Sequence, residues 1–436
     1  MVGCSSRAAL DVSVSAKYSP MNAPVETLYR KVAIAPESVK APSRRVLSID
    51  IFRGITMSVM IFVNELASIR GMPWWTEHAP ARLDLMTYVD MVFPFFLFAI
   101  GMSLPLSVSQ RLKRNASMFA LWIHITTRSL ALLTLGLILA NAEKADPSRM
   151  GMNGSSWALL GLVCGALYLG SYGSSNQWKT VSRILRGLGL AGIVVLLAIY
   201  RRTTSGGQAA WLDFSYPEIL GLIGLSYFAV ALLYVPTRKQ AWAPAVWLSL
   251  LLALCAFTAA RFITFPIRLP HYVWLFGNGA LCSIMMAGVV TSSIFLRAEG
   301  EGTLRKRIWL ALGFAAFALL AGKVLSPLGI SKIRATPTWC LYSIGAAVLL
   351  FTLLYWICDM KGWQRWAAVF RPAGANTLLT YLLPDFWYFA IGAAGVVFFN
   401  VHWSSGWPGV LRTFVFTLLM LGLSAALTRM RVRLQL

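Results

Sequence analysis

Acidic residues are scarce in this chain: 16 of its 436 residues are Asp or Glu, against 39 Lys and Arg. Charged residues of both signs make up 13% of the chain, about half the share found in soluble domains. A soluble protein of this length would need far more polar surface to cover its core. The formal charge of +23 does not indicate a nucleic-acid partner, because the basic residues form short clusters between apolar segments. The composition therefore excludes an ordinary soluble protein.

Cysteine and nucleotide motifs are equally sparse. The chain has six Cys, and five of them lie within or at the end of apolar runs, where free Cys behaves as a small apolar residue. No CxxC or Cys/His spacing predicts a metal site, and no Gly-rich P-loop predicts a nucleotide-driven motor. No apolar segment precedes Cys4, so neither a secretory signal nor a lipid-attachment motif is predicted there.

Long apolar runs dominate what is present. Apolar residues make up 58% of the chain, and the mean hydropathy is +0.66. The runs fall at 50–69, 85–107, 118–140, 156–173, 182–200, 217–236, 242–262, 272–296, 307–327, 338–358, 374–399 and 408–428. Each is close to the ~20 residues that a helix needs to cross the hydrocarbon core. Because the runs are continuous rather than alternating, they predict an all-α transmembrane bundle of about 12 spans, or 10 without the shorter pair at 156–200.

Basic residues between the runs predict an orientation. Alternate connections are rich in Lys and Arg, as are the segment before the first run and the C-terminal tail: Arg44, Arg45, Arg111, Lys113, Arg114, Lys179, Arg183, Arg186, Arg238, Lys239, Arg305, Lys306, Arg307, Lys361, Arg365, Arg371, Arg429, Arg431 and Arg433. By the positive-inside rule both termini are cytoplasmic, and the connection 70–84 faces the opposite side. The pair Arg201–Arg202 is an exception to this pattern, because it lies on that opposite side.

The first 45 residues differ from the rest. They are rich in Ser, Ala, Pro and Lys and have no long apolar run, which predicts a disordered cytoplasmic tail. We also expect that translation starts at Met21 and that residues 1–20 are an over-long extension. The transmembrane domain is then residues 46–436.

Polar residues are costly inside a bilayer, and the most informative ones lie between Arg45 and Leu104. Asp50 and Arg53 open the first run and, three residues apart, share a helix face on which they can pair. Asn64 lies near the far end of that run. A Trp-rich loop with His78 follows, and Asp90 lies just inside the second run.

These motifs resemble those of a known family. The stretch "SIDIFRGITMSVMIFVNELAS", the loop with "EHA" and the stretch "VDMVFPFFLFAIGMS" are similar to segments of the heparan-α-glucosaminide N-acetyltransferase family and its bacterial relatives. Further similar segments are "TRSLALLTLGLIL" at 127–139, "DMKGW" at 359–363 and "PAGANTLLTY" at 372–381. The resemblance implies acetyl transfer from cytoplasmic acetyl-CoA, a co-substrate, to the amine of a glucosamine-type sugar across the membrane.

The resemblance assigns the active site to His78, with Asn64 as its neighbour. An imidazole, which titrates at about pH 6.5 in water, can accept the proton of an amine nucleophile, or can itself accept the acetyl group and pass it on. Asn64 or a backbone N–H could donate to the developing oxyanion, and Asp90 could orient His78 through its second ring nitrogen. In the plainer alternatives, His78 is an interfacial residue of the loop and Asn64 bonds backbone groups at the helix end.

Four residues are candidates for binding acetyl-CoA. Asp50 and Arg53 either lie near the CoA phosphates or form an ion pair that anchors the helix. Arg128 either faces a phosphate or extends to the cytoplasmic interface. Asn376 lies in a stretch of small residues that packs helices closely, within the last matching motif. His124 is interpreted as an interhelical hydrogen-bonder without a catalytic role.

Departures from the family pattern concern the acceptor. Residues Tyr216–Phe228 carry Gly221 and Leu222 where the family has a Gln-Arg pair, and the large luminal portion of the lysosomal enzyme is absent. These departures suit a divergent branch of the family that is associated with N-acetylglucosamine use. Its members are expected to lie in the lipid bilayer of the bacterial inner membrane. The alternative is an inner-membrane carrier for an amino sugar or a cell-wall fragment, without acyl transfer. The sequence does not decide whether the chain is a homodimer.

Overall fold

The computed structural model describes residues 47–114, 117–172, 176–263, 274–296, 303–396, 398 and 402–434. The predicted disordered tail and the proposed start at Met21 lie outside these residues. The longer helices are α2 (Leu47–Leu66), α3 (Val89–Lys113), α4 (Met118–Ala142), α6 (Gly154–Leu169), α7 (Asn176–Ile199), α8 (Glu218–Thr237), α9 (Ala243–Ala259), α10 (Ala280–Leu296), α11 (Thr303–Val324), α12 (Pro337–Leu354), α14 (Thr377–Ala393) and α16 (Gly406–Arg429). Short helical segments are α5 (Pro147–Met150), α13 (Arg371–Ala375), η1 (Trp74–Thr76), η2 (Ser326–Leu328), the π-helix η3 (Tyr355–Met360) and η4 (Arg365–Val369).

The prediction of an all-α membrane bundle is confirmed. Each apolar run corresponds to a helix, and the described strands are only the two-residue β1 (Arg202–Thr203) and β2 (Ala209–Ala210). Eight helices among the described residues are long and apolar enough to cross a membrane, and α6, α9 and α10 are shorter apolar helices. The number of spans therefore stays a prediction. The pair at 156–200 is helical and belongs to the bundle, because α6 packs on α4 and α14.

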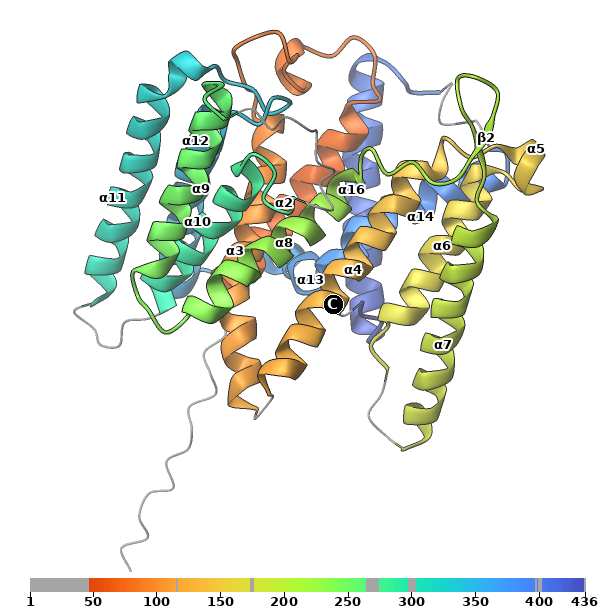
Figure 1. Ribbon diagram of the computed structural model, residues 1–436, viewed down its shortest axis with the longest axis horizontal. Helices are drawn as coiled ribbons and strands as arrows, with labels where there is room; N and C mark the ends of the chain where they lie inside the picture. The colour runs from red at the N-terminus through yellow and green to blue at the C-terminus, as the bar shows by residue number, and fades with distance from the viewer. Residues whose placement is uncertain are drawn as a thin grey trace, which may run out of the picture. The chain divides into compact units, whose positions relative to one another are not determined.

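The most extensive helix–helix contacts are those of α3 with α10, α4 with α8, α6 with α7 and α11 with α12. Figure 1 shows α9 to α12 at one side of the bundle, α6 and α7 at the other, and α2, α3, α4 and α8 between them. Glycines allow the closest crossing: a Cβ on Gly101 of α3 would lie 1.8 Å from the Met285 carbonyl oxygen, and one on Gly288 of α10 would lie 2.1 Å from that of Phe98. Close backbone contact of this kind is a main source of helix association in lipid.

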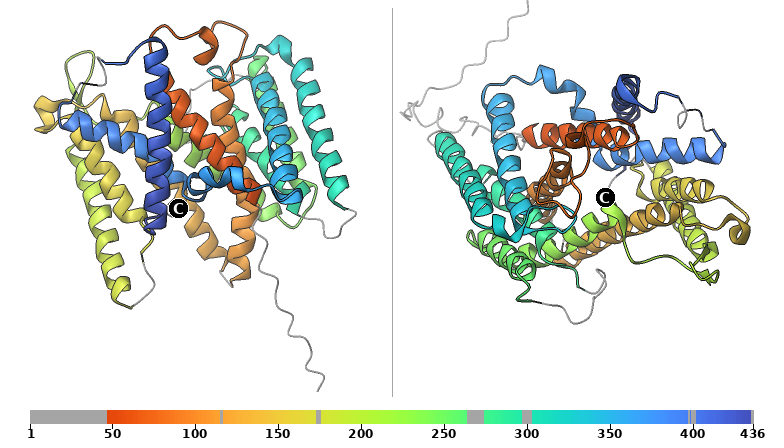
Figure 2. Two further views of the ribbon diagram at one scale, coloured as in Figure 1. Left: turned by 180° about the vertical axis from the view of Figure 1, so that it is seen from behind. Right: turned by 90° about the horizontal axis from the view of Figure 1, so that it is seen from above.

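Two ends of the bundle matter for function. The His78 end is where residues 67–88 connect α2 to α3, at the top of Figure 1, and the Arg111 end is where α3 leads into α4. Figure 2 shows the same elements from behind and from above. At the Arg111 end, Asp359 of the "DMKGW" motif accepts hydrogen bonds from the Leu47 and Ser48 N–H groups at 3.2 and 3.0 Å. An acceptor at the open N–H groups of a helix start stabilises that start, so this motif fixes the beginning of α2.

The exceptional basic pair Arg201–Arg202 has a local structural role. Arg201 Nη1 donates to the carbonyl oxygens of Ala198 and Tyr200 at 2.8 and 2.6 Å, where α7 ends. Arg202 Nε donates to the Trp211 carbonyl at 2.9 Å across the β1–β2 hairpin. Basic side chains are favourable at helix C-termini, so this pair terminates α7 and holds the hairpin, which explains its position without changing the predicted orientation.

Candidate active site

His78 is held by a buried carboxylate. Its Nδ1 lies 2.8 Å from Asp90 Oδ1, and the Asp90 side chain is 0% exposed whereas that of His78 is 45% exposed. Asp90 also accepts hydrogen bonds from the Thr87 and Ala79 N–H groups at 3.0 and 3.3 Å. An ionised carboxylate only accepts, so the proton of a neutral His78 lies on Nδ1 and the lone pair on Nε2. The structure thus brings together two residues that the sequence proposed as partners.

Lys332 is the third member of this group. Its Nζ lies 3.1 Å from His78 Nε2 and 3.3 Å from Nδ1, and it comes from the connection between α11 and α12. Burial lowers the pKa of Lys332, and the nearby Asp90 carboxylate opposes that shift. The sequence showed Lys332 only as a charge in one connection, and no motif marked it.

A buried indole fixes the position of Asp90. Trp339 Nε1, at the start of α12, donates to the Asp90 main-chain carbonyl at 3.0 Å. Trp339 and Lys332 also line a cavity of about 500 Å³ with Phe93 and Tyr216. His78 therefore lies beside a cavity large enough for a small ligand.

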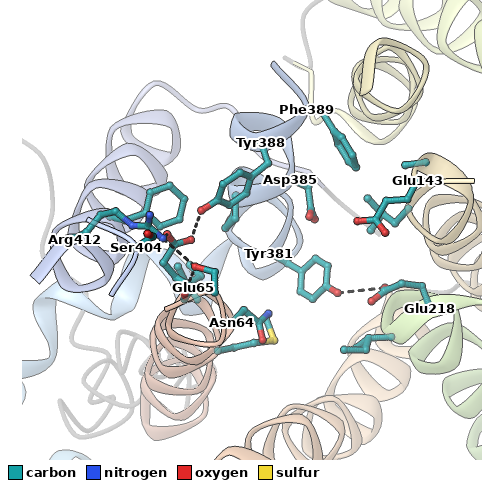
Figure 3. A pocket seen from close by; sticks show the side chains of 18 of the residues that line it. Asn64, Glu65, Glu143, Glu218, Tyr381, Asp385, Tyr388, Phe389, Ser404 and Arg412 are labelled. Atoms are coloured by element: carbon teal, nitrogen blue, oxygen red, sulfur yellow. Dashed lines mark hydrogen bonds and ion pairs between the residues drawn. The ribbon is translucent and has the colours of Figure 1, made fainter. Parts of the chain in front are cut away.

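Asn64 lies on the wall of a different cavity. It is exposed on α2 and lines a space of about 530 Å³ at the His78 end, shown in Figure 3. Within the described residues its side chain makes no hydrogen bond to His78. Its neighbour Glu65 lies 2.9 Å from Arg412 Nη2 of α16 and accepts a hydrogen bond from the Tyr388 hydroxyl. The predicted pairing of Asn64 with His78 as a catalytic residue remains a prediction.

Carboxylates gather in this second cavity. Glu143, Glu218 and Asp385 line it, and Figure 3 shows their side chains pointing into the space between α14 and the ends of α4 and α8. Tyr381 donates to Glu218 Oε2 at 3.4 Å. We call it the acidic cavity. Sequence reasoning missed Glu218 and Asp385, although both lie inside apolar runs, where a carboxylate is costly enough to indicate function.

A third cavity, of about 610 Å³, lies at the Arg111 end and is basic. Its lining includes Arg53, Arg111, Arg128, Arg186 and His124. The Arg128 guanidinium lies over the Tyr227 ring, 4.6 Å from its centroid. Arg128 Nε and His124 Nε2 are buried and have no hydrogen-bond partner within the described residues, so the interhelical bond predicted for His124 is not formed there. We call it the basic cavity, and its unused donors and positive charge suit phosphate oxygens.

Two of the residues predicted to bind the cofactor, Asp50 and Asn376, bond to other protein groups beside the basic cavity. Asp50 pairs with Arg53 at 2.6 Å, which confirms the predicted ion pair. Asn376 is 2% exposed; its Nδ2 donates to the Val432 carbonyl at 2.9 Å, and its Oδ1 accepts from the Leu434 N–H at 3.2 Å. The side chain of Asn376 therefore holds the C-terminal tail, which itself lines the cavity through Leu434. Direct contact of Asp50 or Asn376 with a cofactor remains a prediction.

The acidic and basic cavities lie one above the other along the same helices. Both are lined by residues of α2, α4 and α14. Arg53 and Asn64 mark the two levels on α2, eleven positions apart, which is about 16 Å along a helix axis. The bundle thus presents an arginine-lined cavity at one end and a carboxylate-lined cavity at the other.

Comparisons with known proteins point to one group. A family model described as "Domain of unknown function (DUF5009)" matches residues 45–265. Heparan-alpha-glucosaminide N-acetyltransferase of Homo sapiens is 39% identical over 97 residues, which cover 22% of this chain and 14% of the human protein. The Mus musculus protein of the same name is 34% identical over 106 residues, or 24% of this chain and 15% of the mouse protein. The similarity therefore spans about a seventh of each relative.

Proposed function

This chain belongs to the DUF5009 family, and from its likeness to the two N-acetyltransferases we propose that it transfers an acetyl group from acetyl-CoA to the amine of a glucosamine-type sugar. The observation that carries the proposal is the contact of His78 Nδ1 with the buried Asp90 carboxylate. A carboxylate–imidazole pair of this kind presents a basic Nε2 to a reacting group. We place the protein in a bacterial inner membrane, with the basic cavity on the cytoplasmic side.

The basic cavity is the proposed donor site. Acetyl-CoA supplies an activated thioester, and its phosphates need several positive charges at fixed positions. Arg111, Arg128 and Arg186 reach the cavity from three different helices, α3, α4 and α7, and Arg53 adds a fourth charge from α2. Arginine forks bind phosphate oxygens with two parallel hydrogen bonds. This supports a donor with phosphate groups.

His78 is the proposed base that accepts the proton of the acceptor amine. As the amine nitrogen bonds to the acetyl carbon and the carbon–sulfur bond breaks, the amine loses a proton, which Nε2 of His78 can accept. In the two-step alternative, Nε2 takes the acetyl group first and the amine then takes it from the imidazole. Both routes need an unprotonated Nε2. The acidic cavity supports an amino sugar as acceptor, because Glu143, Glu218 and Asp385 attract its ammonium group, which must first lose a separate proton to become the amine that attacks.

The test is acetyl transfer by the purified full-length protein. Protein in detergent is given radiolabelled acetyl-CoA and glucosamine, and labelled N-acetylglucosamine is measured for the native chain, His78→Ala and His402→Ala. We expect His78→Ala to lose about 10²–10⁴-fold in rate. His402 is an exposed histidine of another connection, so its variant should keep the native rate. Native-rate labelling by His78→Ala would contradict the proposal.

A carrier is the second candidate. The observation that favours it is the placement of the two cavities along α2, α4 and α14, since polar cavities at both ends of the same helices suit a path across the membrane. Proteoliposomes loaded with radiolabelled glucosamine discriminate between the candidates. Sugar flux without acetylation, unchanged in His78→Ala, would favour the carrier.

A further inference from the structure

The imidazole of His78 lies between two opposite charges. Asp90 Oδ1 of α3 lies 2.8 Å from Nδ1, and Lys332 Nζ of the α11–α12 connection lies 3.1 Å from Nε2 and 3.3 Å from Nδ1. Among the other charged residues of the two connections beside His78, Arg334 and Asp84 pair with each other, and Glu77 and Arg82 are exposed to solvent. The charges of Arg334 and Asp84 offset one another at a distance, and those of Glu77 and Arg82 are screened. Asp90 and Lys332 therefore dominate the field at the ring.

A lone carboxylate would give His78 the wrong protonation state. A buried, ionised Asp90 attracts a second proton to the ring, because the imidazolium form pairs with it more strongly. The imidazolium has no lone pair and can neither accept a proton nor bond to an acetyl carbon. A cation at hydrogen-bond distance from Nε2 opposes that second proton, because two like charges would then lie about 3 Å apart.

We propose that Lys332 is a positioning residue of the active site, whose ammonium group keeps His78 neutral with its proton on Nδ1. The inference rests on the proposed function for its catalytic meaning, and on the contacts of the ring with Asp90 and Lys332 for its geometry. When a substrate group arrives, it replaces Lys332 at Nε2, and the lysine remains beside the ring as a charge.

The connection that carries Lys332 is fixed in place. The Ser331 N–H donates to Thr336 Oγ1 at 3.0 Å, and the Arg334 N–H donates to Ser331 Oγ at 3.3 Å. The Ile330 N–H donates to Asp84 Oδ1 at 3.3 Å, and Asp84 belongs to the same connection as His78. The hydrogen bonds of Asp84 to Arg334 and Ile330 lower the pKa of Asp84, so it stays ionised. Two connections distant in sequence are thus joined, which keeps Lys332 at the imidazole.

The pH dependence of acetyl transfer tests this role, because a purely structural lysine would not change it. The variants are Lys332→Met, which removes the charge, Lys332→Arg, which keeps it, and Lys323→Met, which removes an exposed lysine of α11. In Lys332→Met, protonation of His78 becomes more favourable, so the acid limb should move to higher pH by about one to two units. The rate at pH 6 should then fall about 10–100-fold, with a much smaller change at pH 8.5. Lys332→Arg and Lys323→Met should keep the native profile, and an unmoved acid limb in Lys332→Met would overturn the inference.

A second measurement needs no catalysis. Diethyl pyrocarbonate modifies unprotonated imidazole, and mass spectrometry can follow its reaction with His78 across pH in the folded protein, with His402 as internal reference. The pH midpoint of His78 modification should be higher in Lys332→Met than in the native chain. A shifted midpoint supports the coupling even if His78→Ala remains active, in which case the proposed function alone fails. Coincident midpoints overturn the inference whatever the activity.

Discussion

The indole N–H of Trp339 donates a hydrogen bond to the main-chain carbonyl of Asp90, 3.0 Å away and 249 positions earlier in the chain. Trp339 is 1% exposed and belongs to the first turn of α12, whereas Asp90 belongs to the first turn of α3. The bond joins the starts of two helices at the level of His78. The carboxylate that orients the imidazole is therefore held from two sides, by its own helix and by α12.

Trp339→Phe should weaken this attachment while retaining most of the packing. The variant keeps an aromatic ring but leaves a buried carbonyl without its donor, which costs about 1–3 kcal/mol. We expect a lower midpoint of thermal unfolding in detergent and a reduced rate of acetyl transfer. Trp363→Phe, at an exposed tryptophan, is the control. Equal unfolding midpoints for the two variants would show that the Trp339 bond does not stabilise the protein.

Asp90→Asn tests the orienting carboxylate. Asparagine retains an oxygen acceptor of the same size, but it lacks the charge that fixes the Nδ1 proton of His78. Substituting groups that orient a ligating or catalytic histidine typically costs about 10–100-fold, and we expect a loss of that size in the acetyl-transfer rate. Glu77→Gln is the matched control, because Glu77 is an exposed carboxylate of the connection that carries His78. The orienting role fails if both variants lose activity equally.

Arg412→Leu should strongly destabilise the bundle. The side chains of Arg412 and Glu65 are only 11% and 5% exposed and lie 2.9 Å apart, so removing the arginine leaves a buried, uncompensated carboxylate. Such a loss costs about 3–5 kcal/mol. The double variant Glu65→Leu with Arg412→Leu should recover much of the stability, as measured by thermal unfolding in detergent. If the double variant is less stable than the single one, desolvation of Glu65 is not the cause.

Neutral substitutions in the basic cavity should weaken donor binding. Arg111→Gln, Arg128→Gln and Arg186→Gln each remove one charge, and a lost charge-assisted hydrogen bond corresponds to a KM for acetyl-CoA raised by about tenfold or more. Steady-state kinetics at two ionic strengths measure this. Arg371→Gln is the control, because Arg371 is exposed and does not line the cavity. If KM is unchanged in all three variants, acetyl-CoA does not bind there.

The connection beyond α4 should loosen in acid. Asp146 accepts hydrogen bonds from Ser148 N and Oγ at 3.0 and 2.6 Å and from the Thr203 hydroxyl, and these bonds lower its pKa to about 2 from 3.8. The stabilisation is present above about pH 4 and is lost as the pH falls through 2, because protonation removes the acceptor charge. Hydrogen exchange of residues 146–151, corrected for intrinsic rates, should rise over that range. Asp146→Asn should abolish the pH dependence, and a pH-independent native chain would contradict the assignment.

Hydropathy located the helices well because a helix that crosses the hydrocarbon core needs about twenty apolar residues, whether they face lipid or the interior of the bundle. It could not locate the breaks inside them. The run 374–399 contains the end of α13, a break at Asn376, and α14. That break depends on the hydrogen bonds of Asn376 with the C-terminal tail, a contact over more than fifty positions. Likewise the run 338–358 ends in a π-helix, whose fifth residue, Asp359, accepts hydrogen bonds from the first N–H groups of α2.

The candidate site was only partly predictable for the same reason. His78 and Asp90 are twelve positions apart, His78 within the connection 67–88 and Asp90 in the first turn of the helix that follows, so their contact could be proposed from order along the chain. Lys332 lies 254 positions from His78, and the packing of α12 on α3 together with the bonds of Asp84 to Ile330 and Arg334 brings it there. Glu218 and Asp385 carried a usable signal, since each is a carboxylate within an apolar run. No such signal marked the Glu218–Tyr381 contact, because it depends on where α14 meets α8.

The tail held by Asn376 has a practical consequence for anyone who attaches a tag to this protein. Residues 432–434 are held to the bundle by hydrogen bonds of their backbone groups. Val432 and Leu434 bond to Asn376, and the Arg433 carbonyl accepts a hydrogen bond from the Ser171 N–H at 2.8 Å. A bulky fusion joined close to Leu434 would strain these bonds, and Leu434 lines the basic cavity. A reporter or purification handle there needs a long flexible spacer, or kinetic constants for the donor will describe the fusion instead of the native chain.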